Sequence, residues 1–335
     1  MLTFVAVKIH IRFLNCFAAL VLVFSLFSCQ KKETLQAEEP DPVDTTKPVL
    51  CPDCEFPDTV WKTSSGAKQF SVRLKFDSTQ LRLNDLGQPS SPGAGAQSPV
   101  VKRMSIDYIE LMPNANTGPG GGIVIYKANE TSCGGAKAIN FCKGYVLEEN
   151  EVLVSVDLNT IPAGSYPWIR ISIAYQELVV QAQSLSAGKT GATLAGFSGG
   201  LTYLSKTKIQ NTVLTPTLGG TGNKNRGYWM FYQEVFNTAY RLEGQAPHTT
   251  VVNSNPQVVN TNTLSFVYGQ FVNSNTMNTE ALVIGSNETN NREIILSLST
   301  NKSFEWTEIT NDGLFQPEIG ENILDFGCRG LLPLF

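Results

Sequence analysis

The sequence predicts an all-β protein, an antiparallel β-sandwich of immunoglobulin-like or jelly-roll type, built as one sandwich or as two packed β lobes. Short runs alternate apolar and polar residues, as in FSVRLKF at 70–76, which is the pattern of a half-buried strand. Stretches rich in Gly, Pro, Asn and Ser lie between these runs and favour turns. The runs are not joined by the regular helical segments that βαβ units require.

The expected strands follow one another from residue 70 to residue 309. After FSVRLKF they are MSIDYIEL, IVIYKA, VLVSVDL, WIRISIAY, ELVVQAQ, LTYL, LSFVYGQF, ALVIG, EIILSLS and SFEWTEI. Charged residues make up 16% of the chain. A soluble domain averages about 25%, and here Asn, Thr, Ser and Gly fill the difference. We therefore place a β-sandwich domain at residues 67–335.

The first 28 residues resemble the signal peptide of a bacterial lipoprotein. Lys8 and Arg12 give a positive start, and the apolar stretch at 13–27, roughly 15 residues, is too short for a comfortable membrane span. LFSC, Leu26 to Cys29, resembles a lipobox, which implies cleavage before Cys29 and diacylation of its thiol. Two or three acyl chains, at about 0.8 kcal/mol per buried CH₂, make a firm anchor. An uncleaved signal anchor and a soluble secreted protein are the alternatives.

Residues 29–66 predict a tether, because they are polar, charged and interrupted by prolines. Their EEPD segment resembles the export signals of some surface lipoproteins of Bacteroidota. We therefore expect an outer-membrane anchor, with the domain facing the periplasm or lying at the cell surface. After loss of the signal, 23 Lys and Arg stand against 29 Asp and Glu, and no basic run is present. This acidic balance argues against nucleic acid as a partner.

Five cysteines besides Cys29 remain in the mature chain, and disulfides are the default expectation outside the cytoplasm. Cys133 and Cys142 flank GGAKAINF, a spacing that suits a clip across a loop or hairpin. Cys51 and Cys54 form CPDC in the Pro-rich tether, where a structural bridge is favoured over redox chemistry because no βαβ pattern surrounds them. Since five is odd, one thiol stays free or pairs elsewhere, and Cys328 is a further candidate partner for the CPDC cysteines.

Two glycine-containing motifs fail the tests for phosphate binding. AGKT at 187–190 resembles the end of a P-loop, but Gln183 stands where that motif needs glycine. GPGGG at 118–122 precedes a strand, so no helix N-terminus is available for a phosphate. We expect a flexible loop there.

The densest aromatic segment is GYWMFYQEVFNTAYRLEG, residues 227–244. Its apolar residues follow helical spacing, and TAYRLEG alternates as a strand does. We expect a short helical turn over 229–235 followed by a strand, with one face buried in the core. The candidate ligand or metal residues of this region are Trp229, Met230, Tyr232 and, in the next loop, His248, which is the one histidine left after signal removal.

Four stretches of the chain carry a family resemblance: SIDYIEL at 105–111, IPAGSYPWIRISIAY at 161–175, GYWMFY…YRLEG at 227–244 and LSFVYGQF at 264–271. Together they resemble the MbnP-like domain, a β-sandwich family of extracytoplasmic bacterial proteins associated with copper. The resemblance implies copper as a possible cofactor, bound by tryptophans and a histidine in the last two stretches. The sequence departs from that pattern, since it keeps Trp229 alone in the aromatic stretch and carries Tyr268 where the strand histidine would stand.

We expect a binding or structural module of the cell envelope, anchored through Cys29, with a glycan or another envelope protein as its partner. The alternative is an MbnP-like copper-handling lipoprotein. We do not expect an enzyme. A glycan-active hydrolase would need paired carboxylates about 5–9 Å apart across a cleft, and its candidates would be Asp107 with Glu110, the glutamates of EENE (148–151) and Glu318 with Glu321. Asp107 lies on the polar phase of its expected strand, which predicts a solvated face.

Overall fold

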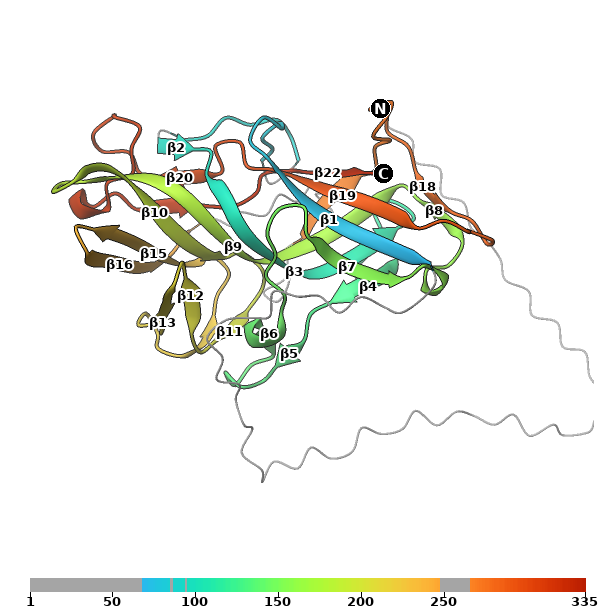
Figure 1. Cartoon of the computed structure of the whole chain (residues 1–335), viewed down its shortest axis with the longest axis horizontal. Helices are drawn as coiled ribbons and strands as arrows, with labels where there is room; N and C mark the ends of the chain where they lie inside the picture. The colour runs from blue at the N-terminus through green and yellow to red at the C-terminus, as the bar shows by residue number, and fades with distance from the viewer. Residues whose placement is uncertain (1–67, 85–86, 94, 248–265) are drawn as a thin grey trace, which may run out of the picture. The chain divides into compact units, whose positions relative to one another are not determined.

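The computed structural model describes residues 68–335, apart from 85–86, 94 and 248–265. Within these ranges the chain is all-β, and its helical pieces are single 3₁₀ turns, η1 (Phe141–Lys143), η2 (Leu158–Thr160) and η3 (Pro317–Ile319). Several sheets pack together, as the predicted β-sandwich requires (Figure 1). No helix in these ranges has the length and apolar character needed to cross a membrane.

The largest sheet is built around one long strand, β9, which joins the two segments expected as separate strands. Its order is β16-β15-β10-β9-β3-β4, and β17 pairs with the first half of β9 where β10 pairs with the second. The strands of this sheet are β3 (Val100–Met112), β4 (Ile123–Lys127), β9 (Trp168–Ser184), β10 (Gly188–Phe197), β15 (Tyr228–Val235), β16 (Thr238–Gln245) and β17 (Phe266–Gln270).

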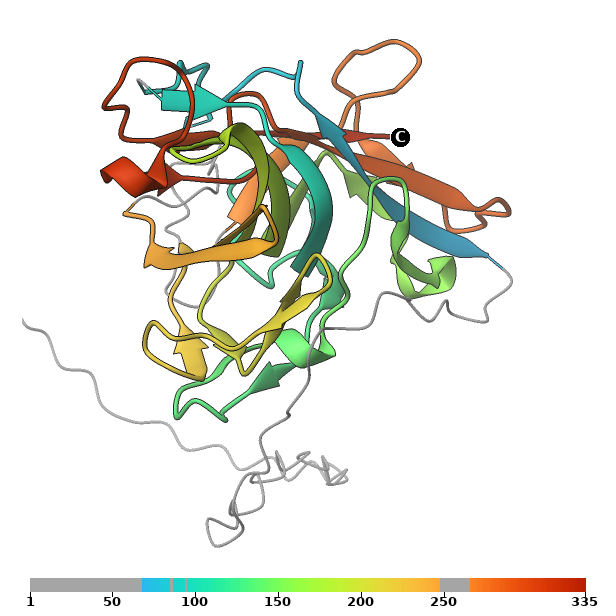
Figure 2. The ribbon, with the colours of Figure 1, turned by 60° about the vertical axis from the view of Figure 1, so that its left-hand side comes forward.

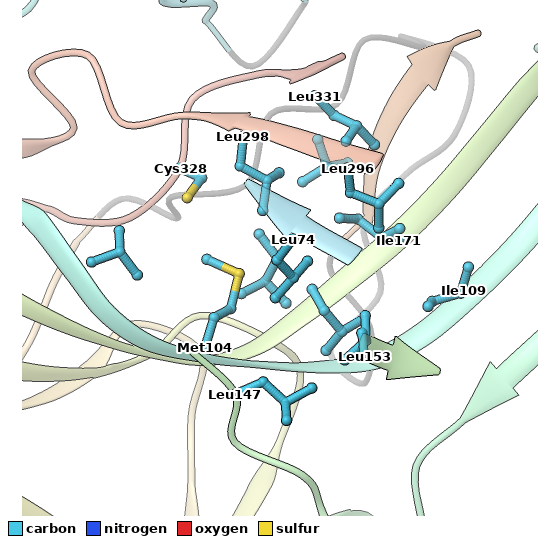
Figure 3. Packing of buried hydrophobic residues seen from close by; sticks show 14 of the residues in the cluster. Leu74, Met104, Ile109, Leu147, Leu153, Ile171, Leu296, Leu298, Cys328 and Leu331 are labelled. Atoms are coloured by element: carbon cyan, nitrogen blue, oxygen red, sulfur yellow. The ribbon is translucent and has the colours of Figure 1, made fainter. Parts of the chain in front are cut away.

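A four-stranded sheet packs against one face of the largest sheet. Its order is β22-β19-β1-β7, with strands β1 (Gln69–Asp77), β7 (Val152–Asp157), β19 (Arg292–Ser299) and β22 (Leu331–Leu334). The β1–β19 pair is parallel within this otherwise antiparallel sheet. Leucines and isoleucines of both sheets meet in the main core (Figure 3), which also contains residues of β10 and β15.

Short strands complete the molecule. One group covers the other face of the largest sheet, and the 3₁₀ turn η1 lies with it (Figure 2). That group consists of β5 (Glu130–Thr131), β6 (Ala138–Asn140), β11 (Thr202–Leu204) and β14 (Gly222–Lys224) in one sheet, and β12 (Thr207–Ile209) and β13 (Thr212–Leu214) in another. The remaining strands are β2 (Gly95–Gln97), β20 (Phe304–Trp306) and β21 (Ile323–Asp325), and the pair β8 (Gly164–Tyr166) and β18 (Leu282–Ile284).

The second core lies between the largest sheet and these short strands. It holds Tyr175, Phe197, Tyr228 and Met230 from the sheet, packed with Phe141 of η1 and with the leucine and isoleucine side chains of β11–β13. Its aromatic rings meet at tilted or edge-on angles, with centroids 5.1–5.8 Å apart, which is the geometry that ring quadrupoles favour. The largest sheet is therefore buried on both faces around β9, β10 and β15.

Two glycines of β10 differ in what surrounds them, and this difference makes a test of the packing. A Cβ added to Gly196 would lie 2.3 Å from the ring of the buried Phe326, whereas a Cβ on Gly191 would meet nothing within 4 Å. We predict that Gly196→Ala lowers the free energy of unfolding by about 1–3 kcal/mol through overpacking. Gly191→Ala should leave it unchanged or slightly higher. Urea unfolding measures both, and equal midpoints for the two variants would contradict this packing.

Candidate functional site

The aromatic stretch at 227–244 forms the hairpin β15–β16, so the predicted helical turn over 229–235 is wrong. Tyr228 to Gln233 are all buried, because β15 lies between β10 and β16 and both of its faces are covered. A strand buried on both faces loses the alternation of apolar and polar residues, and its apolar positions then also match helical spacing. For this segment strand propensity was a better guide than residue spacing, since aromatic residues favour strands.

The candidate ligand residues of β15 lie on opposite faces of the sheet. Trp229 and Phe231 belong to the main core, whereas Met230 and Tyr232 belong to the second core. His248 lies outside the residues that the structure describes. Within those residues, no group of three or more His, Cys, Asp or Glu side chains is placed to hold a metal ion. The contacts of β15 therefore do not bring Trp229 together with Met230 and Tyr232.

Strands β3 and β9 share a buried ion pair. Glu110 of β3 and Arg170 of β9 face each other in the strand ladder, and both side chains are fully buried. Arg170 donates from Nε to Glu110 Oε2 at 2.6 Å and from Nη1 to the Tyr268 hydroxyl at 3.3 Å. Tyr268 thus supports an arginine. Burial raises the pKa of the Tyr268 hydroxyl.

The GPGGG loop closes over this ion pair and is held by it, which corrects the expectation of a flexible loop. The backbone N–H of Gly122 donates to Glu110 Oε1 at 2.6 Å, and that of Gly120 donates to Oε2 at 3.2 Å. Arg170 Nη2 donates to the carbonyl of Gly118. A Cβ on Gly122 would lie 2.2 Å from the Leu111 carbonyl oxygen, so the close approach needs glycine. The anion that the backbone N–H groups of this loop bind is therefore the Glu110 carboxylate of the protein itself.

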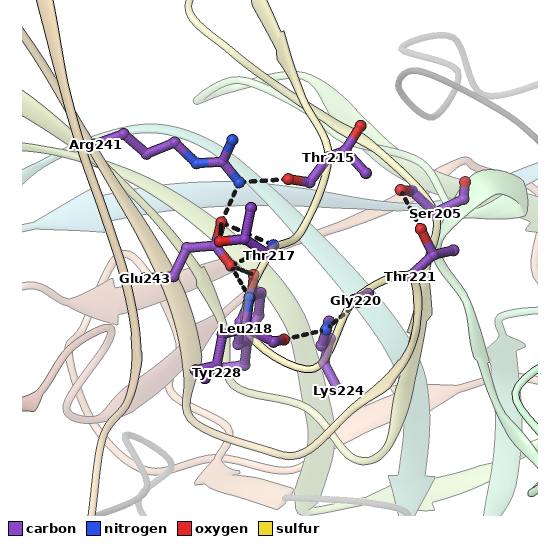
Figure 4. A network of polar contacts seen from close by, with 10 residues as sticks. All are labelled: Ser205, Thr215, Thr217, Leu218, Gly220, Thr221, Lys224, Tyr228, Arg241 and Glu243. Atoms are coloured by element: carbon purple, nitrogen blue, oxygen red, sulfur yellow. Dashed lines mark hydrogen bonds and ion pairs between the residues drawn. The ribbon is translucent and has the colours of Figure 1, made fainter.

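A second polar network joins β15 and β16 to the loop at 215–224 (Figure 4). Glu243 of β16 accepts hydrogen bonds from the Tyr228 hydroxyl at 2.6 Å, from the Leu218 N–H at 2.9 Å and from Thr217, and it pairs with Arg241. Burial alone would raise the pKa of Glu243, but the Tyr228, Leu218 and Thr217 hydrogen bonds outweigh it and lower this pKa to about 2. The network fixes the loop to the hairpin.

Two hollows flank the β15–β16 hairpin on the side of the segment 315–323. The Trp229 hollow, about 290 Å³, is lined by Trp229, residues 242–245 of β16 and residues of 315–323. The Trp229 ring packs across Gly244. A Cβ at position 244 would lie 2.3 Å from this ring, so the indole can pack there only because residue 244 is glycine. The indole N–H has no hydrogen-bond partner in the part of the chain that the structure describes. The Phe236 hollow, about 260 Å³, lies at the tip of the hairpin.

The Phe236 hollow brings together residues that the sequence did not predict to form a site. It is lined by Ser184, Ser186, Gln233, Val235, Phe236, Thr238, Ala239, Tyr240 and Glu318. Phe236 and Asn237 form a two-residue turn between Val235 and Thr238, which pair across the strands. Asn237 was the available turn signal, because asparagine tolerates the left-handed conformation that two-residue hairpin turns require. The helical spacing obscured this turn, because Phe236 is one of the apolar residues that follow that spacing and was therefore expected on the buried face.

The other candidate carboxylates have separate surroundings. Asp107 is 3% exposed, so the prediction of a solvated face is wrong. It lies at a bulge between Ile106 and Tyr108, and a bulge redirects a side chain. Burial raises the pKa of Asp107 to about 7. The EENE segment is an exposed turn, as expected. Glu321 is buried and accepts hydrogen bonds from the Ile309 and Gln316 N–H groups.

The cysteines in the described ranges form no disulfide with one another. Cys133 and Cys142 are not joined, so the predicted clip is not formed in the structure. The Cys142 sulfur lies 4.0 Å from the Ser205 hydroxyl oxygen, and Cys142 is itself disulfide-bonded. Cys328 is a buried free thiol in the main core (Figure 3), and burial raises its pKa. Its predicted partners, Cys51 and Cys54, lie outside the described residues, as Cys29 does.

The tryptophan side chains in the described ranges do not form an open stacking surface. Trp229 is 9% exposed and Trp306 is 1% exposed, and Trp168 is half-buried against the cluster of Tyr108, Phe266 and Tyr268. Comparison of the chain with protein-family models, curated proteins and solved structures finds no match. The contacts within the molecule are therefore what a functional proposal must rest on.

The buried ion pair predicts a large cost when one partner is removed. Arg170→Met should lower the free energy of unfolding by about 3–5 kcal/mol, because it leaves the Glu110 carboxylate buried without its cation. The matched control is Arg73→Met, which breaks an exposed pair with Glu293 and should cost less than about 1 kcal/mol. Replacing both partners, with Glu110→Leu added to Arg170→Met, should recover part of the loss. A double variant less stable than Arg170→Met would contradict this assignment.

Asp107 predicts a pH dependence of stability. Its folded pKa of about 7 lies above the ordinary value of 3.8, so between these values the unfolded chain releases a proton that the folded chain keeps. Unfolding free energy should therefore fall as pH rises from 4 to 7, by at most about 4 kcal/mol from this group, at about 1.4 kcal/mol per pKa unit. Asp107→Asn should remove this slope. Urea unfolding across that range tests it, and parallel pH profiles for variant and wild type would contradict it.

Proposed function

We propose that the protein is a lipid-anchored module of the bacterial cell envelope that binds a partner through the β15–β16 hairpin. The observation that carries the binding role is the pair of hollows along this hairpin, about 260 and 290 Å³, each lined by both aromatic and polar side chains. Binding sites typically combine such apolar walls with a few placed polar groups. The hairpin is held by the Glu243 network, so the hollows belong to a preorganised surface.

The anchor in this proposal is Cys29, and the tether is 29–66. The acyl chains would sit in the outer membrane, and the tether would let the domain reach its partner from the periplasmic side or at the cell surface. The polar network around Glu243 favours binding over catalysis, because its carboxylate accepts hydrogen bonds from several fixed donors and keeps a low pKa. Such a group is a weak base at neutral pH.

A copper-handling role is the alternative that the MbnP-like resemblance suggests. It would draw on Trp229, Met230 and His248. Copper(I) prefers soft ligands such as Met, Cys and His that converge on one point. Since Trp229 and Met230 face opposite cores, we give the partner-binding role precedence.

Metabolic labelling with palmitate tests the anchor. The wild-type chain, produced in a bacterium that processes lipoproteins, should incorporate label and fractionate with membranes. Cys29→Ser should lose the label, because it removes the thiol that is acylated, and Cys51→Ser should keep it as the matched control. An unlabelled wild type, or a labelled Cys29→Ser variant, would reject the anchored module.

A further inference from the structure

Phe236 occupies a position that the fold itself disfavours for a bulky residue. Its φ is 49° and that of Asn237 is 60°, so both turn residues are left-handed, as in the two-residue hairpin turns that favour Asn-Gly. The Phe236 side chain is 81% exposed. Neither the backbone conformation nor burial accounts for a phenylalanine here. Such strained positions gather at functional sites.

The groups around Phe236 combine aromatic faces with hydrogen-bonding edges. Tyr240 contributes a second aromatic ring, held edge-on against Phe231 with centroids 6.4 Å apart. Glu318 is fixed at the rim by the Leu185 N–H, which donates to Oε2 at 2.7 Å, and by the Ser184 hydroxyl. Gln233 is oriented by its donation to the Thr190 hydroxyl. The hydroxyls of Ser186 and Thr238 complete the polar lining.

We propose that the Phe236 hollow binds one sugar ring of a glycan, packed on Phe236 and hydrogen-bonded by Glu318 and Thr238. A pyranose presents C–H groups on its faces, and these suit the negative face of an aromatic ring. Its hydroxyls both donate and accept, which matches the Glu318 carboxylate and the Ser186 and Thr238 hydroxyls. The lining includes a carboxylate and no Lys or Arg, so it disfavours an anionic ligand.

The size of the hollow agrees with a ligand of one ring. Its volume of about 260 Å³ falls just below the roughly 300–1,000 Å³ of pockets for drug-sized ligands. The hollow opens at the hairpin tip, so the rest of a glycan chain can extend into solvent. This inference rests on the proposed binding function and gives that function its ligand class.

Saturation-transfer difference NMR tests this site with defined probes. The probes are the methyl glycosides of glucose, galactose, mannose and N-acetylglucosamine, and the protein is the mature chain carrying Cys29→Ser so that it stays in solution. We expect transfer to the ring C–H protons of at least one glycoside. Phe236→Asn should weaken that binding about tenfold, as loss of an aromatic anchor does. The same variant should unfold at an equal or higher temperature, because Asn suits a left-handed turn.

Met277→Asn is the matched control, since Met277 is also exposed, at 62%, and also left-handed, with φ 57°, but does not line this hollow. It should keep the wild-type signal. No transfer to any of the four glycosides, or equal transfer with Phe236→Asn, would overturn the sugar site. Palmitate labelling does not depend on the hollow. Loss of sugar binding with retained labelling therefore rejects this site alone, and absent labelling rejects the anchored module.

Discussion

Burial of the largest sheet on both faces is the constraint on which the rest of the structure depends. The four-stranded sheet covers one face and the short strands of 130–224 cover the other. Strands β9, β10 and β15 must therefore supply apolar residues in both directions. In β15 this divides one aromatic stretch between two cores, with Trp229 on one side and Met230 and Tyr232 on the other. This segment is rich in aromatic residues because its side chains pack into two cores, one on each face of the sheet.

The same constraint explains where the buried charges lie and what they do. Glu110 and Arg170 face each other between strands and hold the GPGGG loop. Glu243 holds the 215–224 loop in a similar way. In each case a buried carboxylate accepts several hydrogen bonds, which offsets the cost of removing it from water. Buried charge thus serves to fix loops onto the sheets, and the hairpin tip at Phe236 is left exposed.

The sequence predicted the fold well where strands alternate and poorly where they do not. The alternating runs at 70–76, 104–111 and 293–299 lie within β1, β3 and β19. Strand β10 was missed because its sequence, GKTGATLAGF, is rich in glycine and small residues. Position 196 requires glycine because the Phe326 ring packs against it. Asp107 was misplaced because a bulge breaks the period of two. Phe236 was missed because its turn was hidden in a helical pattern. Tertiary structure, which residue spacing does not encode, decided these three cases.

The central claim, that the aromatic stretch is a strand divided between two cores, is tested most directly by NMR of the folded chain with a ¹³C-labelled backbone and labelled Met methyl and aromatic groups. We predict extended-strand Cα shifts over 228–235. Nuclear Overhauser contacts should join Trp229 to Gly244 and Phe231 to Phe315, and the Met230 methyl should contact the rings of the second core. Helical shifts over these residues, or a contact between the Trp229 ring and the Met230 methyl, would contradict the account.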